Sequence, residues 1–499
     1  MACIVALDQG TTSSRAIIFD DEQRILGSAQ RTFEQFFPQP GWVEHDPEEI
    51  WQSQRDVAIE AIADAGLREA DISAIGITNQ RETTIVWDRR TGKPLHNAIV
   101  WQDRRTAEFC ASLRIAGHEP EVQARTGLVL DPYFSASKIR WILDHCDGAR
   151  DLALAGHLAF GTVDSWLVWK LTNATTHITD MSNASRTSLL NLHTQTWDDE
   201  MLALWDIPRS MLPNVVASSG DLARSTTTGL NNIPITGIAG DQQAALFGQA
   251  CFEPGQAKCT YGTGCFVLLH SGEQPIISKN RLLTTVAWTI NGTTEFALEG
   301  SVFIGGALIQ WLRDSLGLIE QSSDIETLAG QVDSSDGVVF VPAFAGLGPP
   351  HWDPDARGAL LGLTRGTTKA HIALAALEGI AFQVADVFTA MKDDVNRPIA
   401  SIKVDGGASE NRLLMQIQAS LLQTKLIRAE RHESTALGAA SLAGLAIGVW
   451  KDRDELAALW RSGESFTPAH NDTTLERRIA LWREAVKRIK STLSADTIQ

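Results

Sequence analysis

Four consecutive hydroxyl-bearing residues follow a glycine close to the N-terminus, in the segment 8–15 with the sequence DQGTTSSR. A turn of this composition can present backbone N–H groups and hydroxyls in one concavity, which suits phosphate oxygens. Arg15 adds a positive charge, and Asp8 could hold Mg²⁺ through water, because this ion keeps several of its water ligands. Taken alone, the segment is explained equally well by a plain polar hairpin turn.

Two further glycine-containing turns follow short apolar runs. The segment 261–265 (YGTGC) repeats the context of the first turn, and the segment 404–408 (VDGGA) ends in two glycines shortly before Asn411. A strand that ends in Gly-Gly lets a flat or anionic ligand approach the backbone closely. Each of these motifs is weak by itself, because tight turns of the same composition also connect elements that bind nothing.

Charged residues that could bind or react occur at two other strand ends. Asp241 begins a helical segment directly after Gly240, and Arg81 and Glu82 lie in the polar break 79–82. A helix N-terminus favours an ionised carboxylate, so Asp241 could act as a general base, and the alternative is an ordinary N-cap. Arg81 and Glu82 could bind hydroxyls as donor and acceptor, and the alternative is a surface charge pair.

The elements that must position these residues alternate between short β-branched runs and amphipathic helical patterns, which is typical of an α/β fold. Two hairpins are expected, over residues 3–7 with 16–19 and over residues 257–261 with 266–270. Because the pattern restarts near residue 250, we expect two related halves, 1–249 and 250–499. Mixed sheets flanked by helices should form each half, with a cleft between the halves.

The helix expected over residues 47–63 has the clearest start signal in the chain. Asp46 is placed as its N-cap, Pro47 at its first position and Glu49 at its third. The other elements that the pattern predicts are helices over 137–145, 242–248, 303–316, 369–391, 411–423 and 475–493 and strands over 75–78, 83–87 and 235–239.

Composition limits the class of protein. The chain has 499 residues, with 43 Lys+Arg against 60 Asp+Glu, and its formal net charge of −17 argues against a nucleic-acid coat. Its six cysteines form no close pair, as expected of free thiols in a reducing compartment. The first residues lack the basic region of a leader peptide, and the most membrane-like stretch, 435–450, is too short to span a bilayer. We therefore expect a cytoplasmic protein with no membrane insertion.

Together these motifs resemble those of the glycerol kinase branch of the FGGY carbohydrate kinases, a family of the actin-like ATPase superfamily. The resemblance covers nearly the whole chain and rests on the segments 5–15, 76–87, 133–141, 237–248, 260–266 and 358–363. It implies two related actin-like (ribonuclease H-like) domains, the first with the polyol site and one phosphate loop, the second with another phosphate loop and the adenosine site. It also implies ATP and Mg²⁺ as cofactors and the phosphorylation of glycerol to sn-glycerol 3-phosphate.

The resemblance also implies a role for individual residues. Those implied to contact the ATP phosphates are Thr11, Thr12, Ser13, Arg15 and Thr263, with Asp8 near the metal, and those on the nucleoside side are Gly306, Gln310, Gly407 and Asn411. Those implied to hold the glycerol hydroxyls are Arg81, Glu82, Tyr133, Asp241 and Gln242, while Trp101 and Phe266 pack against the carbon chain. Asp241 is the implied base for the attacking hydroxyl.

Three alternatives stay open at this point. An actin- or Hsp70-like nucleotide switch would not need polyol-binding residues such as Arg81 and Trp101. A non-catalytic member of the family would be marked by the loss of Asp8 or Asp241, and both are present. A kinase for another short polyol or a ketose would share most of the site. Oligomers are common among glycerol kinases, so we also expect a homo-oligomer, either a dimer or a tetramer.

Overall fold

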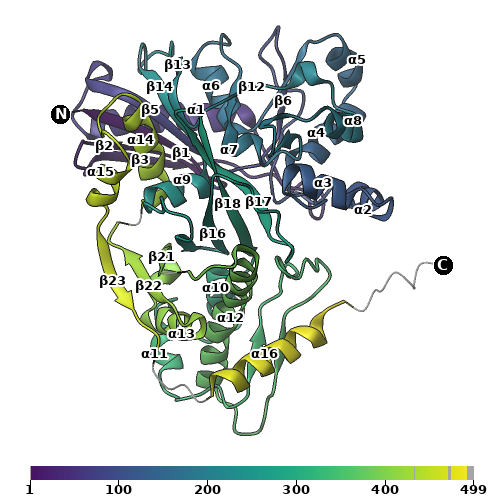
Figure 1. Ribbon diagram of the computed structural model, residues 1–499, viewed down its shortest axis with the longest axis vertical. Coiled ribbons are helices and arrows are strands. Elements are labelled where there is room, and N and C mark those ends of the chain that lie inside the picture. The colour runs from purple at the N-terminus through teal and green to yellow at the C-terminus, as the bar shows by residue number, and fades with distance from the viewer. Residues whose placement is uncertain (1, 400, 432, 470–473, 492–499) are drawn as a thin grey trace.

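The computed structural model describes residues 2–399, 401–431, 433–469 and 474–491, and Figure 1 shows how their helices and strands are arranged. One mixed sheet of 13 strands runs through the described part of the chain. In the order in which they pair, its strands are β23 (Ser462–Phe466), β22 (Lys425–Ala429), β21 (Ser401–Asp405), β15 (Ala257–Tyr261), β16 (Cys265–Gly272), β18 (Thr293–Val302), β17 (Leu283–Ile290), β13 (Ser219–Arg224), β14 (Pro234–Gly240), β5 (Ile72–Asn79), β1 (Cys3–Gln9), β2 (Ser13–Phe19) and β3 (Ile25–Thr32).

The same strand order occurs twice in this sheet. In the first half of the chain, β3, β2 and β1 pair antiparallel, and β1, β5 and β14 pair parallel. In the second half, β18, β16 and β15 pair antiparallel, and β15, β21 and β22 pair parallel. The repeat confirms the prediction of two related α/β domains. Their strands form one continuous sheet, which is joined where Ser219 of β13 pairs with Ile290 of β17.

Each half places a helix between its third and fourth repeated strands. In the first half, α1 (Pro47–Asp64) packs against β1, β2 and β3, and the Asp46 carboxylate caps it by accepting from the N–H of Glu48 at 2.8 Å. In the second half, α12 (Lys369–Val395) packs against β16 and β18. By length and composition α12 could cross a membrane, but 78% of its most apolar 18-residue window is buried. Its apolar character therefore serves the core of the second half.

The helix α14 (Ser434–Ala446) follows the second half in sequence but packs on the first. It contacts α9 (Asp241–Gly248) and the strands β1, β5 and β14. The contact is close, because a Cβ at Gly76 would lie 2.3 Å from the carbonyl oxygen of Ala439, and one at Gly237 would lie 2.5 Å from the nitrogen of Ala443. The small residues of the stretch 435–450 therefore serve helix–sheet packing.

The chain between β5 and β13 forms a region beside the first half of the sheet (Figure 1). It carries Trp101, Tyr133 and Arg186, which enter the candidate site. The elements of this region are β6 (Ile85–Asp88), β7 (Ala98–Ile99), α2 (Ala107–Ile115), α3 (Glu119–Thr126), α4 (Ser135–His145), α5 (Ala149–Leu154), β8 (Leu158–Gly161), α6 (Val163–Leu171), β9 (Ile178–Asp180), α7 (Met181–Ala184), β10 (Leu190–Asn191), β11 (Thr196–Trp197), α8 (Asp199–Trp205) and β12 (Asn214–Val216). Three short strands lie elsewhere in the chain: β4 (Glu44–His45), β19 (Val339–Val341) and β20 (Ala359–Leu361).

The remaining helices are α10 (Gly306–Asp314), α11 (Asp324–Ala329), α13 (Arg412–Leu422), α15 (Arg453–Leu459) and α16 (Leu475–Ile489). Predicted and observed bounds differ mainly at element ends. The helix predicted over 303–316 begins later, because β18 continues to Val302 and Gly305 takes the N-cap position. Asn411 caps α13 and is not part of it. Residues 492–493 of the last predicted helix lie outside the described residues.

Candidate active site

The first polar turn closes the β1–β2 hairpin. The N–H of Gly10 donates to the carbonyl of Ser13 at 2.9 Å, so the hydroxyl-bearing residues lie at the end of the hairpin. The hydroxyl of Thr11 accepts a hydrogen bond of 3.0 Å from the indole Nε1 of Trp101. This bond places a predicted phosphate-binding residue directly beside a predicted glycerol-binding residue.

Asp8 and Arg15 face each other across the same hairpin. They are cross-strand partners, and Nη2 of Arg15 lies 2.8 Å from Oδ2 of Asp8. Nη1 of Arg15 lies 2.5 Å from Oε2 of Glu433, the residue before α14. Burial raises the pKa of Asp8, and the charge of Arg15 opposes that effect. The predicted phosphate cation is thus held between two carboxylates.

Three aromatic rings from different parts of the chain meet next to this turn. The ring centroid of Trp101 lies 5.6 Å from that of Tyr133 and 6.4 Å from that of Phe266. Trp101 and Tyr133 belong to the region between β5 and β13, whereas Phe266 lies on β16 of the second half. The structure therefore brings together the three aromatic residues predicted to contact glycerol.

The polar break after β5 is a buried turn. The N–H of Gln80 donates to the carbonyl of Gln9 at 2.7 Å, which fixes the break beside the end of β1. Arg81 and Glu82 are only 3% and 1% exposed, which excludes the alternative of a surface charge pair. Glu82 has a φ of +61°, a conformation that is uncommon outside glycine. Buried charges and an unusual backbone conformation often mark functional sites.

Asp241 is the first residue of α9, and Gly240 occupies the N-cap position. Its Oδ1 accepts from the N–H of Gln242 at 2.7 Å and lies 3.0 Å from Nε of Arg81. The Asp241 side chain is 31% exposed, unlike the buried Arg81. Gly240 is needed here, because a Cβ would lie 2.7 Å from Cδ of Arg81. Asp241 therefore lies at the helix start without being the N-cap residue, and its Oδ2 has no hydrogen bond to the described residues.

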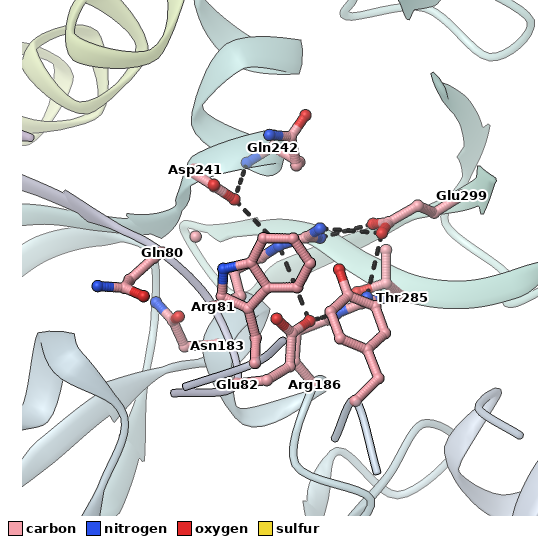
Figure 2. Close-up of polar contacts among 12 residues, drawn as sticks. Gln80, Arg81, Glu82, Asn183, Arg186, Asp241, Gln242, Thr285 and Glu299 are labelled. Atoms are coloured by element: carbon pink, nitrogen blue, oxygen red, sulfur yellow. Dashed lines mark hydrogen bonds and ion pairs between the residues drawn. The ribbon is translucent and has the colours of Figure 1, made fainter. Parts of the chain in front are cut away.

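Two charged residues that the sequence analysis did not single out complete this cluster. Glu299 of β18 binds Arg81 through both carboxylate oxygens, at 2.5 and 2.9 Å. Arg186, which follows α7, donates from Nε to Oε1 of Glu82 at 2.6 Å. Burial acts to raise the pKa of Glu299, but Arg186 and Arg81 outweigh it and lower this pKa to about 2. Figure 2 shows these side chains converging from several elements.

The side chain of Gln242 does not join this cluster. Its Oε1 accepts a hydrogen bond from Nζ of Lys258, and Figure 2 shows the side chain directed away from Arg81. Lys258 also donates to the hydroxyl of Thr260 at 3.0 Å. Burial lowers the pKa of Lys258, and Asp405 acts in the opposite direction. Gln242 is therefore the one predicted glycerol-binding residue that faces a lysine of the second half.

The predicted nucleoside-side residues gather around the second glycine turn. The carbonyl of Thr263 accepts from the N–H groups of Gly305 and Ala307 at 2.8 and 3.1 Å, which fixes the start of α10 beside the β15–β16 turn. A Cβ at Gly306 would lie 3.8 Å from Cβ of Ala408, so the two predicted glycine segments adjoin. A Cβ at Gly407 would meet nothing within 4 Å, which leaves this backbone open to a ligand.

Two further residues of this side lie on or next to helices. Gln310 is exposed one turn into α10, and the side-chain Oδ1 of Asn411 accepts from the N–H of Leu414 at 2.8 Å as the cap of α13. A cavity of about 320 Å³ lies elsewhere, between α12, α16 and the loop at Pro350, and none of the predicted site residues lines it.

The described residues contain no group of three or more His, Cys, Asp or Glu side chains that could hold a metal ion by themselves. A divalent cation held by fewer protein carboxylates takes its other ligands from substrate phosphates and water. Mg²⁺ fits that description, because it usually takes one or two carboxylates together with substrate phosphates. Asp8 is the carboxylate at the first polar turn that matches this role.

Comparison with protein families identifies both halves of the chain. Residues 3–248 match the N-terminal domain of the FGGY family of carbohydrate kinases, and residues 257–447 match its C-terminal domain. The chain is 58% identical over 489 residues to a glycerol kinase of Burkholderia multivorans, covering 98% of each chain. It is 59% identical over 493 residues to a glycerol kinase of Trichlorobacter lovleyi, covering 98% of this chain and 99% of the relative.

Solved structures agree with these relatives. A Plasmodium falciparum glycerol kinase solved with ADP is 36% identical, with a TM-score of 0.93 and 99% of each chain covered. A gluconate kinase from Lactobacillus acidophilus shares the fold, with a TM-score of 0.89 at 22% identity over 98% of this chain and 99% of that one.

Proposed function

The chain belongs to the FGGY family of carbohydrate kinases, and from that premise we propose that it transfers the γ-phosphoryl group of ATP to glycerol. The products are sn-glycerol 3-phosphate and ADP. The observation that carries this function is the contact between Asp241 and Arg81 at 3.0 Å, beside an aromatic wall and the first polar turn. It combines a partly exposed carboxylate with hydroxyl-binding groups, as a polyol kinase requires.

Glycerol is a chain of three carbons, each with a hydroxyl, so its site needs polar and apolar contacts together. Arg81 donates to the hydroxyls and Glu82 accepts from them, because the first carries only donors and the second only acceptors when ionised. Trp101, Tyr133 and Phe266, whose rings adjoin, pack against the carbon chain. Gln242 contributes to this binding only after its amide oxygen leaves Lys258.

Asp241 accepts the proton of the attacking hydroxyl. Its Oδ1 is held by Arg81 and by the N–H of Gln242, so its Oδ2 is the oxygen free to take that proton. The hydroxyl oxygen then forms a bond to the γ-phosphorus as the bond between that phosphorus and the leaving oxygen of ADP breaks. Positioning and charge stabilisation supply most of the catalysis in such transfers.

Residues from both halves hold the nucleotide. Those that bind its phosphates are Thr11, Thr12, Ser13, Arg15 and Thr263, and those that bind the nucleoside are Gly306, Gln310, Gly407 and Asn411. Arg15 is paired with Asp8 and Glu433, so phosphate competes with these carboxylates for it. Asp8 would hold Mg²⁺ through water, and the ion would supply neutralisation of phosphate charge.

A panel of acceptors tests the substrate. ADP release is measured with glycerol, with other short polyols, and with xylulose and gluconate at equal concentrations. We expect kcat/KM for glycerol to exceed that for every other acceptor by about tenfold or more, because each unpaired buried polar group costs binding energy. A higher value for a ketose would identify a different FGGY kinase. ATP hydrolysis that is indifferent to every acceptor would favour a nucleotide switch.

The cellular setting follows from the same proposal. The protein acts in the cytoplasm, where ATP is available, and assembles as a homo-oligomer, a dimer or a tetramer. Light scattering coupled to size-exclusion chromatography measures the mass in solution, and a monomer at micromolar concentration contradicts this part of the proposal. Cell fractionation followed by the glycerol assay tests the location.

A further inference from the structure

Arg81 and Glu82 are two members of a closed group of four buried charged residues. Going around it, Nη1 and Nη2 of Arg81 bind the oxygens of Glu299 at 2.5 and 2.9 Å, and Oε1 of Glu299 accepts from Nη2 of Arg186 at 3.1 Å. Nε of Arg186 donates to Oε1 of Glu82 at 2.6 Å, and that oxygen lies 3.9 Å from Nε of Arg81. Positive and negative side chains therefore alternate, and we call these four residues the charge ring (Figure 2).

The charge ring is closed off from water and balanced in charge. The side chains of its members are at most 2% exposed, so each charge depends on its neighbours in the ring for compensation. Arg186 also lies over aromatic rings, with its guanidinium carbon 5.6 Å from the ring centroid of Tyr133 and 5.4 Å from that of Phe134. Buried charges are costly unless paired, so loss of one member leaves its neighbours uncompensated.

The ring uses only some of the polar atoms of its two polyol-binding members. A guanidinium has five N–H donors. In Arg81 these meet Asp241, Gln243 and two oxygens of Glu299, which leaves one N–H on Nη2 without a partner among the described residues. In Glu82, Oε1 takes the contacts to both arginines, and Oε2 has none among the described residues. One free donor and one free acceptor thus remain.

The ring also connects the two halves of the molecule. Arg81 and Glu82 follow β5 and Arg186 follows α7, all in the first half, whereas Glu299 belongs to β18 of the second half. A bidentate contact between an arginine and a carboxylate fixes the plane of the guanidinium as well as its distance. The direction of the free N–H of Arg81 is therefore set from the opposite half.

We propose that Arg186 and Glu299 are positioning residues that orient Arg81 and Glu82 toward the polyol through the charge ring. This inference rests on the proposed function, because the orientation matters only if a polyol binds there. The alternative is a purely structural role, in which Arg186 and Glu299 form a buried ion pair that stabilises the fold. The two differ in what happens to the KM for glycerol in variants that stay folded.

Glu299→Gln is the main test, with Glu295→Gln as its matched control. Glu295 lies on the same strand and is itself buried, with Nη1 of Arg453 at 2.6 Å and Nε2 of His270 at 2.8 Å from its carboxylate oxygens, although the Arg453 side chain is 39% exposed. We expect Glu299→Gln to raise the KM for glycerol about tenfold or more, as for the loss of a charged hydrogen bond, while the KM for ATP changes by less than about threefold. Glu295→Gln should lower the melting temperature but leave the KM for glycerol at the wild-type value.

Two milder variants apply if Glu299→Gln fails to fold. Glu299→Asp keeps the charge but shortens the side chain, and Arg186→Lys keeps the charge but loses the planar fork. Both should raise the KM for glycerol more than that for ATP. A wild-type KM for glycerol in folded Glu299→Gln or in both milder variants overturns the proposal, as does an equal rise in Glu295→Gln. A wild-type enzyme that does not phosphorylate glycerol overturns the proposed function and this inference together.

Discussion

The two halves of the sheet share a strand order but present opposite chemistry at matching strand ends. In the first half, the fourth strand of the repeat, β5, leads into Arg81 and Glu82, which are buried in a cluster of charges. In the second half, the corresponding strand β21 leads into Gly406 and Gly407, with open space around Gly407. The same backbone position thus offers side chains in one half and bare backbone in the other.

The hairpins of the repeat differ in the same direction. The first turn carries hydroxyls and the Asp8–Arg15 ion pair, and the second is a Gly-Thr-Gly turn against the start of α10. Small hydroxyl compounds are recognised by donors and acceptors on side chains, whereas phosphates and flat rings can be held by backbone approached closely. The comparison teaches that a repeated fold can present side chains at a strand end of one half and bare backbone at the matching strand end of the other.

The largest effect should come from Asp241. Asp241→Asn keeps the shape of the side chain but removes the proton acceptor, so kcat should fall by about 10²–10⁴-fold. Glycerol binding, measured by calorimetry, should stay detectable. Asp452→Asn is the control, because Asp452 caps α15 by accepting from the N–H of Glu455. If both variants keep kcat within about threefold of wild type, Asp241 is a structural residue of the helix start and not the base.

Arg81 should have the next largest effect, and it should be confined to one substrate. Arg81→Ala removes a charged donor worth about 1.5–3 kcal/mol, so the KM for glycerol should rise by roughly 10- to 100-fold. The KM for ATP should change little, because Arg81 belongs to the polyol side of the comparison. Steady-state kinetics with each substrate varied in turn measures both KM values. A rise confined to the KM for ATP would show that Arg81 belongs to the nucleotide site and not to the polyol site.

A substitution at the open glycine of the second half should affect the KM for ATP and not the KM for glycerol. In Gly407→Val, the added Cβ would meet no protein atom within 4 Å. A several-fold rise in the KM for ATP with an unchanged KM for glycerol would therefore report a steric clash between the new side chain and the nucleotide. Gly406→Ala is the contrasting variant, because Gly406 has a φ of +85° and its Cβ would lie 2.6 Å from the carbonyl oxygen of Tyr261. It should lower stability by about 1–2 kcal/mol in thermal unfolding. If Gly407→Val raises the KM for ATP and the KM for glycerol equally, the strand end at Gly407 does not serve the nucleotide alone.

The smallest effect should come from Asp8. Asp8→Asn should raise the Mg²⁺ concentration needed for half-maximal activity by a few-fold and leave maximal activity largely intact at saturating Mg²⁺. The reason is that the phosphates and water supply most of the ligands of this ion. A titration of activity with Mg²⁺ at fixed ATP measures this shift. An unchanged titration curve would show that the first turn does not touch the metal.

The sequence predicted those features that depend on residues close together in the chain. Both hairpins, the capped start of α1 and the polar turn at Arg81 follow from local periodicity and turn chemistry, and the structure has them. The resemblance to known kinases assigned Arg81 and Asp241, which are far apart in sequence, to one glycerol site, but the direct contact between them comes from the structure. It could not supply the present contact between Gln242 and Lys258, because that contact depends on how β15 approaches α9.

Glu299 and Arg186 were missed because each is a single polar residue without a motif. Glu299 binds Arg81 across 218 positions of sequence, and a single sequence carries no signal for a pairing of that length. One signal was present, since Glu299 is a charged residue within strand β18, in which every residue except Thr293 is buried. A charged residue within a buried strand requires a partner of opposite charge, although the sequence does not say which one.

The return of α14 to the first half has a consequence for how the protein is made. Ile4, Ala6 and Ala74 of the first sheet share a core cluster with Ala440 and Ala443 of α14. A ribosome delivers the chain from its N-terminus, and domains usually fold as they emerge. Here the core of the first domain is complete only after Ser434–Ala446 has been translated. One apolar face of that domain therefore stays uncovered while the second domain is being translated. A fragment that ends at residue 249 should therefore aggregate unless α14 is supplied in trans.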